Sequence, residues 1–231
     1  MRILALETST EYCSCALSVD GDVQEVFEHA GQRHSSLLLP MVARLMADCG
    51  VTFDALDAIA FGAGPGSFTG LRIACATAQG LAFARDTPVL PVSTLEALAE
   101  DGGAIRALCC LDARMGELYL AAYAREGPDW RCVHAPCLVK PGALPELPGP
   151  WAGIGSGFAI HAEALVARYA PAVVAPQAVP RARAVAALGT RGFGRGEALP
   201  AAQALPVYLR DKVALDVTEQ AAARAARQAA A

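Results

Sequence analysis

The amino-acid sequence predicts an α/β protein made of two related subdomains. Apolar segments of strand length alternate with helix-length segments along the chain, which is the pattern of α/β folds. Each half also opens in the same way, because a strand ends in a carboxylate, Glu7 or Asp112, and a tight polar turn leads into a returning strand. An Asp-Gly-Gly sequence at 101–103 separates the halves and is the best domain boundary. We therefore expect an N-terminal subdomain at 1–102 and a C-terminal subdomain at 103–231.

In the first half, alternating apolar and polar residues predict three strands joined by tight turns. Two apolar rows with a spacing of four residues then predict a helix that Ser35 or Ser36 caps and Gly50 ends. A buried strand, a glycine-rich segment, a helix of small residues, another strand and a helix capped by Ser93 and Thr94 follow. The strands are expected at 3–7, 13–19, 23–29, 56–61 and 89–92, and the helices at 37–46, 71–84 and 95–100.

The second half repeats the opening strand pair and then changes character. A proline-rich stretch at 136–150 predicts a loop, and residues 206–213 form a distinct terminal segment. The alanine-rich end at 220–231 is expected to be a frayed helix or disordered, and a disordered tail is expected beyond about residue 214. The strands are expected at 105–111, 117–125 and 151–154, and the helices at 158–169 and 181–192.

Composition excludes several classes of protein. Of the 231 residues, 54% are hydrophobic and 18% are charged, which excludes a disordered chain. The net charge of −4 argues against a stand-alone nucleic-acid binder, since phosphate contacts need a basic surface. No transmembrane helix and no secretory signal are expected, so the eight cysteines are interpreted as buried cytosolic thiols.

The most specific segment is the glycine-rich stretch 62–70, which lies between a predicted strand and a predicted helix. Its glycines permit positive φ angles and close approach, and amides at a helix start form a common anion site. It lacks the lysine of a P-loop, the glycine spacing of the dinucleotide fingerprint and the flanking glycines of a nucleophile elbow. A ligand-binding loop and a tight turn without a ligand are therefore equally supported.

The two strand-end carboxylates offer a second candidate feature. If Glu7 and Asp112 faced each other across a cleft, they would have the geometry of an actin-like nucleotide site, although no glycine follows Glu7 in its turn. An ordinary turn stabilised by Ser and Thr hydrogen bonds is the alternative. The candidate nucleotide or anion loop comprises Glu7, Thr8, Ser9, Gly64, Gly66, Ser67, Thr69, Gly70 and Asp112.

Metal ligation is not expected. The histidines form no His-x-x-x-His pair, and the Cys132-x4-Cys137 spacing has no second pair beside it. The predicted helices on either side of the glycine-rich segment have wide apolar or small faces, which exceed what one sheet contact needs. Core packing accounts for most of these faces, and the surplus favours a helical interface with a second chain.

Several segments resemble the TsaB family, also called YeaZ. They are ILALETST at 3–10, HSSLLLP at 34–40, FGAGPGSFTGLRIACATAQGL at 61–81, LDARMGE at 111–117 and VYLRDKV at 207–213. The match keeps the family order over most of the chain, and GPGSFTGLR is highly specific. TsaD-type enzymes hold metal with a His-x-x-x-His pair, whereas here Leu38 stands four residues after His34.

The resemblance implies an actin-like fold of the ASKHA, ribonuclease H-like type, with two subdomains that each contain a mixed sheet flanked by helices. It implies a cytoplasmic, non-catalytic subunit that activates a TsaD-type enzyme in making N6-threonylcarbamoyladenosine at tRNA position 37. Further partners would be a TsaE-type ATPase and a second copy of the chain, with tRNA contacted only indirectly. No tightly bound cofactor is implied, and a subunit interface is the place where ATP or ADP could bind. The expected interface residues are His34, Leu37, Leu38, Met41, Leu45, Leu71, Arg72, Cys75 and Gln79.

Two enzymatic alternatives stay open. An actin-like ATPase or small-molecule kinase acting alone would use Glu7, Asp112 and the glycine-rich loop, and it would need tight ATP binding by the isolated chain. A hydrolase would use Ser67 as its nucleophile, and it would lose activity on replacement of that serine by alanine.

Overall fold

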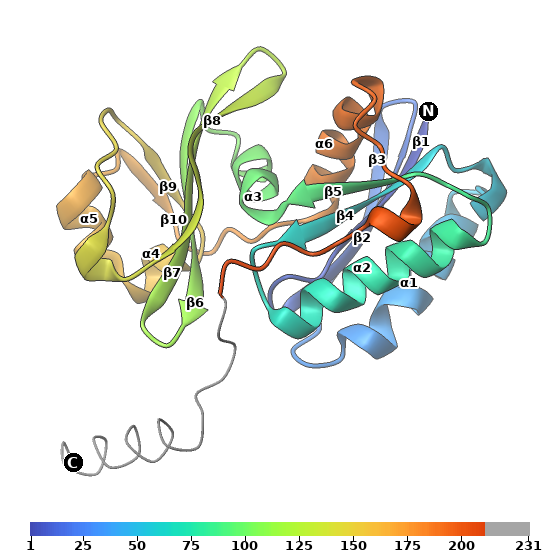
Figure 1. The fold of residues 1–231 in the computed structure, drawn as a ribbon, viewed down its shortest axis with the longest axis horizontal. Helices are drawn as coiled ribbons and strands as arrows, with labels where there is room; N and C mark the ends of the chain where they lie inside the picture. The colour runs from blue at the N-terminus through green and yellow to red at the C-terminus, as the bar shows by residue number, and fades with distance from the viewer. Residues whose placement is uncertain (211–231) are drawn as a thin grey trace, which may run out of the picture.

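The computed structural model describes residues 1–210 and consists of two lobes, each built on a five-stranded mixed sheet (Figure 1). This architecture confirms the predicted α/β class with two related subdomains. The predicted tail beyond residue 214, and the last part of the terminal segment, lie outside the described residues. Among the helices of residues 1–210, none combines the length and the apolar character needed to cross a membrane.

The first sheet has the strand order β3-β2-β1-β4-β5. Its first three strands form an antiparallel meander, and the last two run parallel to β1 because helices connect them. The predicted strand at 56–61 begins two residues later, at Ala58, and reaches Gly64; a short 3-10 turn, η1, precedes it in the chain. The bounds are β1 Arg2–Glu7, β2 Tyr12–Val19, β3 Asp22–His29, η1 Phe53–Ala55, β4 Ala58–Gly64 and β5 Val89–Ser93.

Helices cover both faces of the first sheet (Figure 1). α1 (His34–Asp48) and α2 (Phe68–Phe83) pack on one face, and α6 (Ala182–Gly194) packs on the other. The expected serine cap of α1 is wrong, because Arg33 holds the cap position without a side-chain bond and Ser36 Oγ donates to the Arg33 carbonyl. At α2, Ser67 Oγ does accept the Gly70 amide.

The second sheet has the order β10-β9-β6-β7-β8. The loop expected at 136–150 is wrong at its start, because β8 continues to Val139 and pairs with β7. Pro136 is tolerated there since β8 is an edge strand and its pairing is bulged at this point. The bounds are β6 Arg106–Arg114, β7 Glu117–Glu126, β8 Asp129–Val139, β9 Ala152–Ile154 and β10 Val173–Ala175.

One helix of the second half differs from its prediction, whereas α6 corresponds to the helix expected at 181–192 and extends to Gly194. The single helix predicted at 158–169 is two helices, because the backbone of His161 leaves helical geometry. After the second sheet the chain returns to the first lobe, where α6 and η3 pack, so residues beyond position 102 complete the first core. The remaining bounds are α3 Thr94–Gly102, η2 Pro141–Ala143, α4 Gly157–Ile160, α5 Ala162–Tyr169 and η3 Ala201–Gln203.

Candidate functional site

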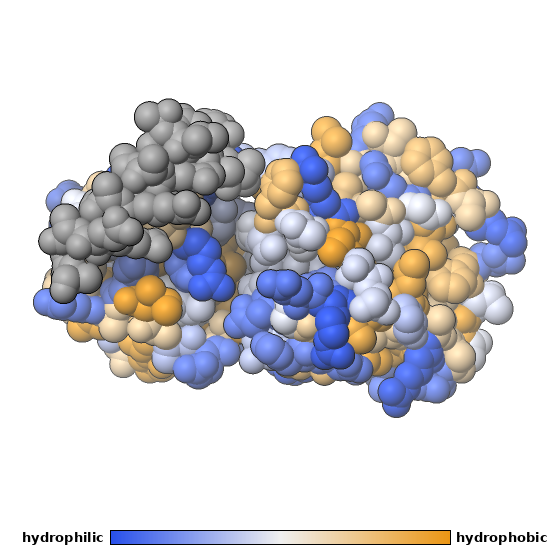
Figure 2. All heavy atoms as spheres, turned by 90° about the horizontal axis from the view of Figure 1, so that it is seen from below, coloured by the Kyte–Doolittle hydropathy of each residue, from blue (hydrophilic) through white to orange (hydrophobic). Residues whose placement is uncertain are grey.

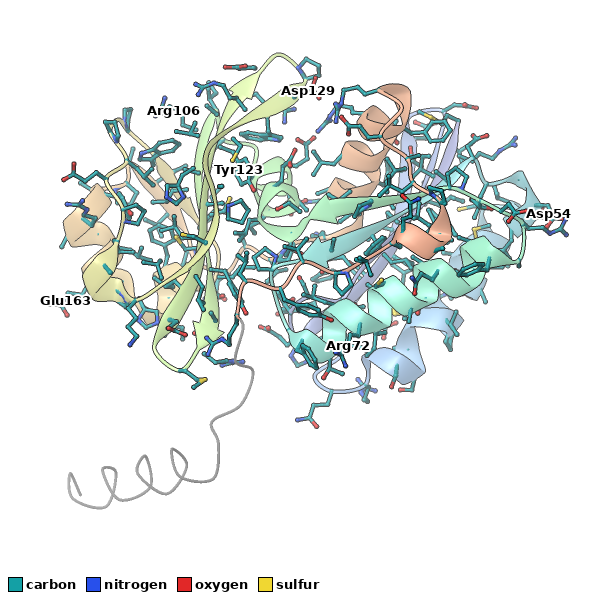
Figure 3. All side chains as sticks on the ribbon, viewed as in Figure 1. Asp54, Arg72, Arg106, Tyr123, Asp129 and Glu163 are labelled. Atoms are coloured by element: carbon teal, nitrogen blue, oxygen red, sulfur yellow. The ribbon has the colours of Figure 1, made fainter. Side chains whose placement is uncertain are left out.

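A cleft of about 780 Å³ lies between the two lobes. The β1–β2 turn, the start of α2, the β6–β7 turn and the terminal segment 207–210 line it. Arg72 extends from the first turns of α2, close to the part of the helix that lines the cleft (Figure 3). Most of the segments that contain predicted site residues therefore line this cleft.

The glycine-rich loop packs directly against the backbone of the β1–β2 turn. A Cβ atom on Gly70 would lie 1.9 Å from the Thr8 carbonyl oxygen, and one on Gly66 would lie 2.6 Å from Ser9 Cβ. Thr8 Oγ1 donates to the Gly70 carbonyl at 2.7 Å, and the Ser67 amide donates to the Ser9 carbonyl at 2.7 Å. The close approach that these glycines permit is therefore made by the chain's own backbone.

Glu7 lies beneath this turn rather than at the cleft surface. Its side chain is buried, and its Oε1 accepts the Ser9 amide at 2.5 Å. Gly62 leaves room for the carboxyl group, because a Cβ there would lie 2.0 Å from Glu7 Oε2. Burial raises the pKa of Glu7, although the bonds from Ser9 and Thr8 oppose this shift.

Replacing Glu7 with glutamine should flatten the pH dependence of stability. Above the ordinary pKa the unfolded chain ionises while the folded chain holds its proton, so the free energy of unfolding falls as pH rises toward the raised pKa. Glu7→Gln keeps the acceptor for the Ser9 amide and removes this loss, so its stability relative to the wild type should be greater at pH 8 than at pH 5. Urea unfolding at both pH values measures the difference, with exposed Glu146→Gln as the control. An equal difference at the two pH values would show that Glu7 is ionised in the folded chain.

Asp112 lines the cleft, but its carboxylate is already engaged. Oδ1 accepts the Arg114 amide at 2.9 Å, and Oδ2 pairs with the Arg114 guanidinium at 3.2 Å. The Asp112 amide donates to Ser156 Oγ at 3.1 Å. The carboxylate therefore closes the β6–β7 turn rather than facing Glu7 across open space.

The predicted loop residues separate into two groups. Those that line the cleft are Ser9, Gly66, Ser67, Thr69, Gly70 and Asp112. Those that lie behind it are Glu7, Thr8 and Gly64, of which Gly64 approaches the Val207 carbonyl of the terminal segment. The structure thus brings the two predicted turns to one cleft without placing the two strand-end carboxylates opposite each other.

His34 serves the fold through its ring nitrogen. Nε2 lies 2.9 Å from the Thr10 carbonyl and 3.0 Å from the Tyr12 carbonyl, so it acts as a donor that ties α1 to the β1–β2 turn. Within residues 1–210, no group of three His, Cys, Asp or Glu side chains is placed to hold a metal ion. Because His34 Nε2 donates its proton to these carbonyls, this nitrogen has no lone pair with which to bind a metal ion.

The residues expected to form a partner interface are mostly buried within the chain itself, and this corrects the predicted surface. Both apolar rows of α1 are used in covering the sheet and α2, so their side chains are not available to a partner. Leu37 and Gln79 are half-buried, and Arg72 is exposed. The buried members are His34, Leu38, Met41, Leu45, Leu71 and Cys75.

The outer faces of the same helices carry a different set of residues. On α2, small Ala76 and Gly80 are exposed between Arg72 and Phe83. On α1, the exposed residues include Leu39, Pro40, Ala43 and Arg44. Figure 2 looks from below onto this lobe, where hydrophobic and hydrophilic residues are interspersed.

A cluster of two aromatic residues and an arginine near the cleft was not predicted from the sequence. Arg72 Cζ lies 3.9 Å from the centre of the Phe68 ring, and its Nε donates to Tyr208 Oη at 3.1 Å. The Phe68 and Tyr208 ring centres are 5.3 Å apart. The sequence marks 206–213 as a distinct terminal segment, but nothing in these residues indicates that they pack against α2.

Comparisons with known proteins find similarity to two proteins of threonylcarbamoyladenosine biosynthesis, TsaD and TsaB. The family model described as "TsaD: tRNA N6-adenosine threonylcarbamoyltransferase" matches residues 26–226. The chain is 37% identical to "tRNA threonylcarbamoyladenosine biosynthesis protein TsaB" of Escherichia coli strain K12, over 93% of this chain and 96% of that protein. It is 33% identical to the protein of the same name from Haemophilus influenzae, over 92% of this chain and 95% of that protein.

A solved structure shares the fold. YeaZ from Pseudomonas aeruginosa superposes with a TM-score of 0.83 and 40% sequence identity, covering 90% of this chain and 99% of that one. The resemblance that the sequence motifs indicated, and the actin-like fold that it implied, are both confirmed.

Proposed function

This chain belongs to the TsaB (YeaZ) family, and from that premise we propose that it is a non-catalytic activating subunit whose direct partner is a TsaD-type enzyme. Its role lies in the biosynthesis of threonylcarbamoyladenosine in tRNA. In the proposal, the partner transfers the threonylcarbamoyl group to adenosine 37, and this chain holds the partner in its active arrangement. A TsaE-type ATPase completes the assembly in the cytoplasm.

The state of the polar groups at the cleft supports a non-catalytic role. A general base must reach a proton of the substrate, and a nucleophile must have a base beside it. Here the Glu7 carboxyl is buried, the Asp112 carboxylate binds Arg114, and Ser67 Oγ caps α2. Each candidate group of the enzymatic alternatives thus has a structural task.

The observation that carries the partner role is the outer face of α2. Small side chains at Ala76 and Gly80 let another helix approach closely, while Arg72 and Phe83 at the ends of the face supply charge and apolar area. Neighbouring α1 adds Leu39, which is 52% exposed. We define these residues, Arg72, Ala76, Gly80, Phe83 and Leu39, as the α2 face.

The same face serves a second copy of the chain or the TsaD-type partner, so the two associations compete. The net charge of −4 leaves tRNA binding to the other subunits. We propose no tightly bound cofactor, and we place ATP or ADP, when present, at the boundary between subunits.

Sedimentation velocity tests the competition. The chain alone should sediment as a homodimer, and addition of a TsaD-type enzyme should convert it into a heterodimer at the expense of the homodimer. A chain that stays monomeric and forms no complex at micromolar concentrations would contradict the proposal. Calorimetry with ATP on the isolated chain decides the kinase alternative, which requires tight binding.

A further inference from the structure

Residues 205–210, which include the first part of the terminal segment, connect the two lobes across the end of the cleft. Figure 1 shows this segment leaving η3, running along α2 and ending beside β6 and β7. The segment lies far in sequence from both regions, so each contact that it makes joins distant parts of the chain. We call residues 205–210 the strap.

The strap is fixed to the first lobe through its backbone. The Val207 amide donates to the Ala63 carbonyl at 2.7 Å, and the Val207 carbonyl lies where a Cβ on Gly64 would be, 2.6 Å away. Just before it, the Ala204 carbonyl accepts from Gln79 Nε2 at 3.1 Å. Tyr208 then packs beside the rings and guanidinium of α2 described above.

Arg210 fixes the other end of the strap to the second lobe. Its guanidinium pairs with Glu117 Oε2 at 2.7 Å and donates to the Ala113 carbonyl at 3.0 Å and to Met115 Sδ at 2.8 Å. Its side chain is only 12% exposed, so the pair with Glu117 is largely shielded from water. Leu209 packs against the apolar core of the second lobe.

A second set of bonds joins the lobes at the opposite end. Glu100 accepts from Trp130 Nε1 at 2.6 Å and from Arg125 Nη1 at 2.5 Å in the second sheet, and from Arg191 Nη1 at 3.1 Å in α6. Asp129, labelled in Figure 3 at the tip of the β7–β8 hairpin, pairs with Arg195 beyond the end of α6 at 2.7 Å. Because these bonds join the lobes at the end opposite the cleft, opening of the cleft depends on the strap.

We propose that the strap is a latch that holds the two lobes at a fixed angle and keeps the cleft from opening. Relative motion is the ordinary expectation for two lobes around a cleft, and closure around a ligand is a common use of it. Here one chain segment is bonded to both walls of the cleft, so the lobes behave as one rigid body. This inference stands apart from the proposed partner role, because its test measures lobe motion and not threonylcarbamoyl transfer.

Hydrogen exchange of the full-length chain tests the latch. Arg210→Ala removes the bonds to the second lobe, and Glu117→Gln weakens the same attachment from the other side. Both variants should raise exchange of the Val207 amide by about tenfold while the buried amides of α1 keep their protection. Small-angle scattering should show a larger radius of gyration. Arg44→Ala is the control, because Arg44 pairs with Asp48 on the exposed side of α1, away from the strap.

Two results would overturn the proposal. One is unchanged protection of Val207, or an unchanged radius of gyration, in both variants, since the lobes then keep their arrangement. The other is an equal rise in exchange at Val207 and in α1, since that pattern means loss of stability throughout and not release of a latch. If Arg210→Ala does not fold, Glu117→Gln decides by the same criteria.

Discussion

Ala76→Arg should weaken assembly with a TsaD-type partner by roughly a hundredfold while leaving the fold intact. Ala76 is exposed in the middle of α2, and arginine is a good helix former, so the isolated chain should keep its stability. At the centre of a helix interface the added charge has neither room nor a counter-ion, which costs about 3 kcal/mol, or roughly a hundredfold in Kd. Titration of the variant with the partner, followed by calorimetry, measures this loss.

Ala167→Arg is the matched control for this substitution. Ala167 is an exposed alanine of α5, in the second lobe, so the same change is made on a helix outside the α2 face. Its partner affinity should equal that of the wild type. Wild-type affinity for Ala76→Arg as well would place the interface elsewhere on the chain.

Gly70→Ala should produce the largest loss of stability among the glycine substitutions in α2. The added methyl would lie 1.9 Å from the Thr8 carbonyl oxygen, a backbone atom that cannot rotate away. Relief requires the β1–β2 turn to move, which breaks the bond from Thr8 Oγ1 to Gly70 and loosens the cover over Glu7. We expect a decrease of about 3 kcal/mol in the free energy of unfolding, measured with urea.

Gly80 provides the contrast within the same helix. An added Cβ there meets no atom within 4 Å, so Gly80→Ala should increase stability by about 0.5–1 kcal/mol through helix propensity. Both measurements belong at protein concentrations where the chain is monomeric, because Gly80 is part of the α2 face. Equal effects of the two substitutions would show that the β1–β2 turn gives way easily and that Gly70 is not required for close packing.

The strands of the first lobe could be predicted because their pattern is local. Alternation along β2, and the tight turn before β3, define the antiparallel hairpin without information from elsewhere. β8 was not predicted, because no strand was expected at 129–135 and Pro136 is a loop signal, whereas its place at a bulge of an edge strand depends on β7. The break at His161 likewise has no helix-breaking residue to announce it.

The partner surface could not be located from the periodicity of α1. Leu38, Met41 and Leu45 repeat at helical spacing, but core and interface select the same apolar residues. The structure assigns these side chains to the core and leaves small and charged residues outside. A sequence therefore shows that a helix has an apolar face, but not what covers it.

The glycine-rich loop illustrates a related limit. Four glycines within nine residues correctly indicate that something approaches the backbone closely. The approaching residues are Glu7, Thr8, Ser9 and Val207 of the same chain, which lie far away in sequence. A high local content of glycine predicts that some group lies close to the backbone. Which group it is depends on the tertiary fold.

Omission of this chain from a reconstituted reaction tests the proposed accessory role most directly. The mixture contains tRNA, a TsaD-type enzyme, a TsaE-type ATPase, the enzyme that forms the threonylcarbamoyl adenylate, ATP and threonine, and modified adenosine is measured by mass spectrometry. We predict that modification is lost without the chain, is restored by wild-type chain and by Ala167→Arg, and is not restored by Ala76→Arg. Equal modification with and without the chain would contradict the account.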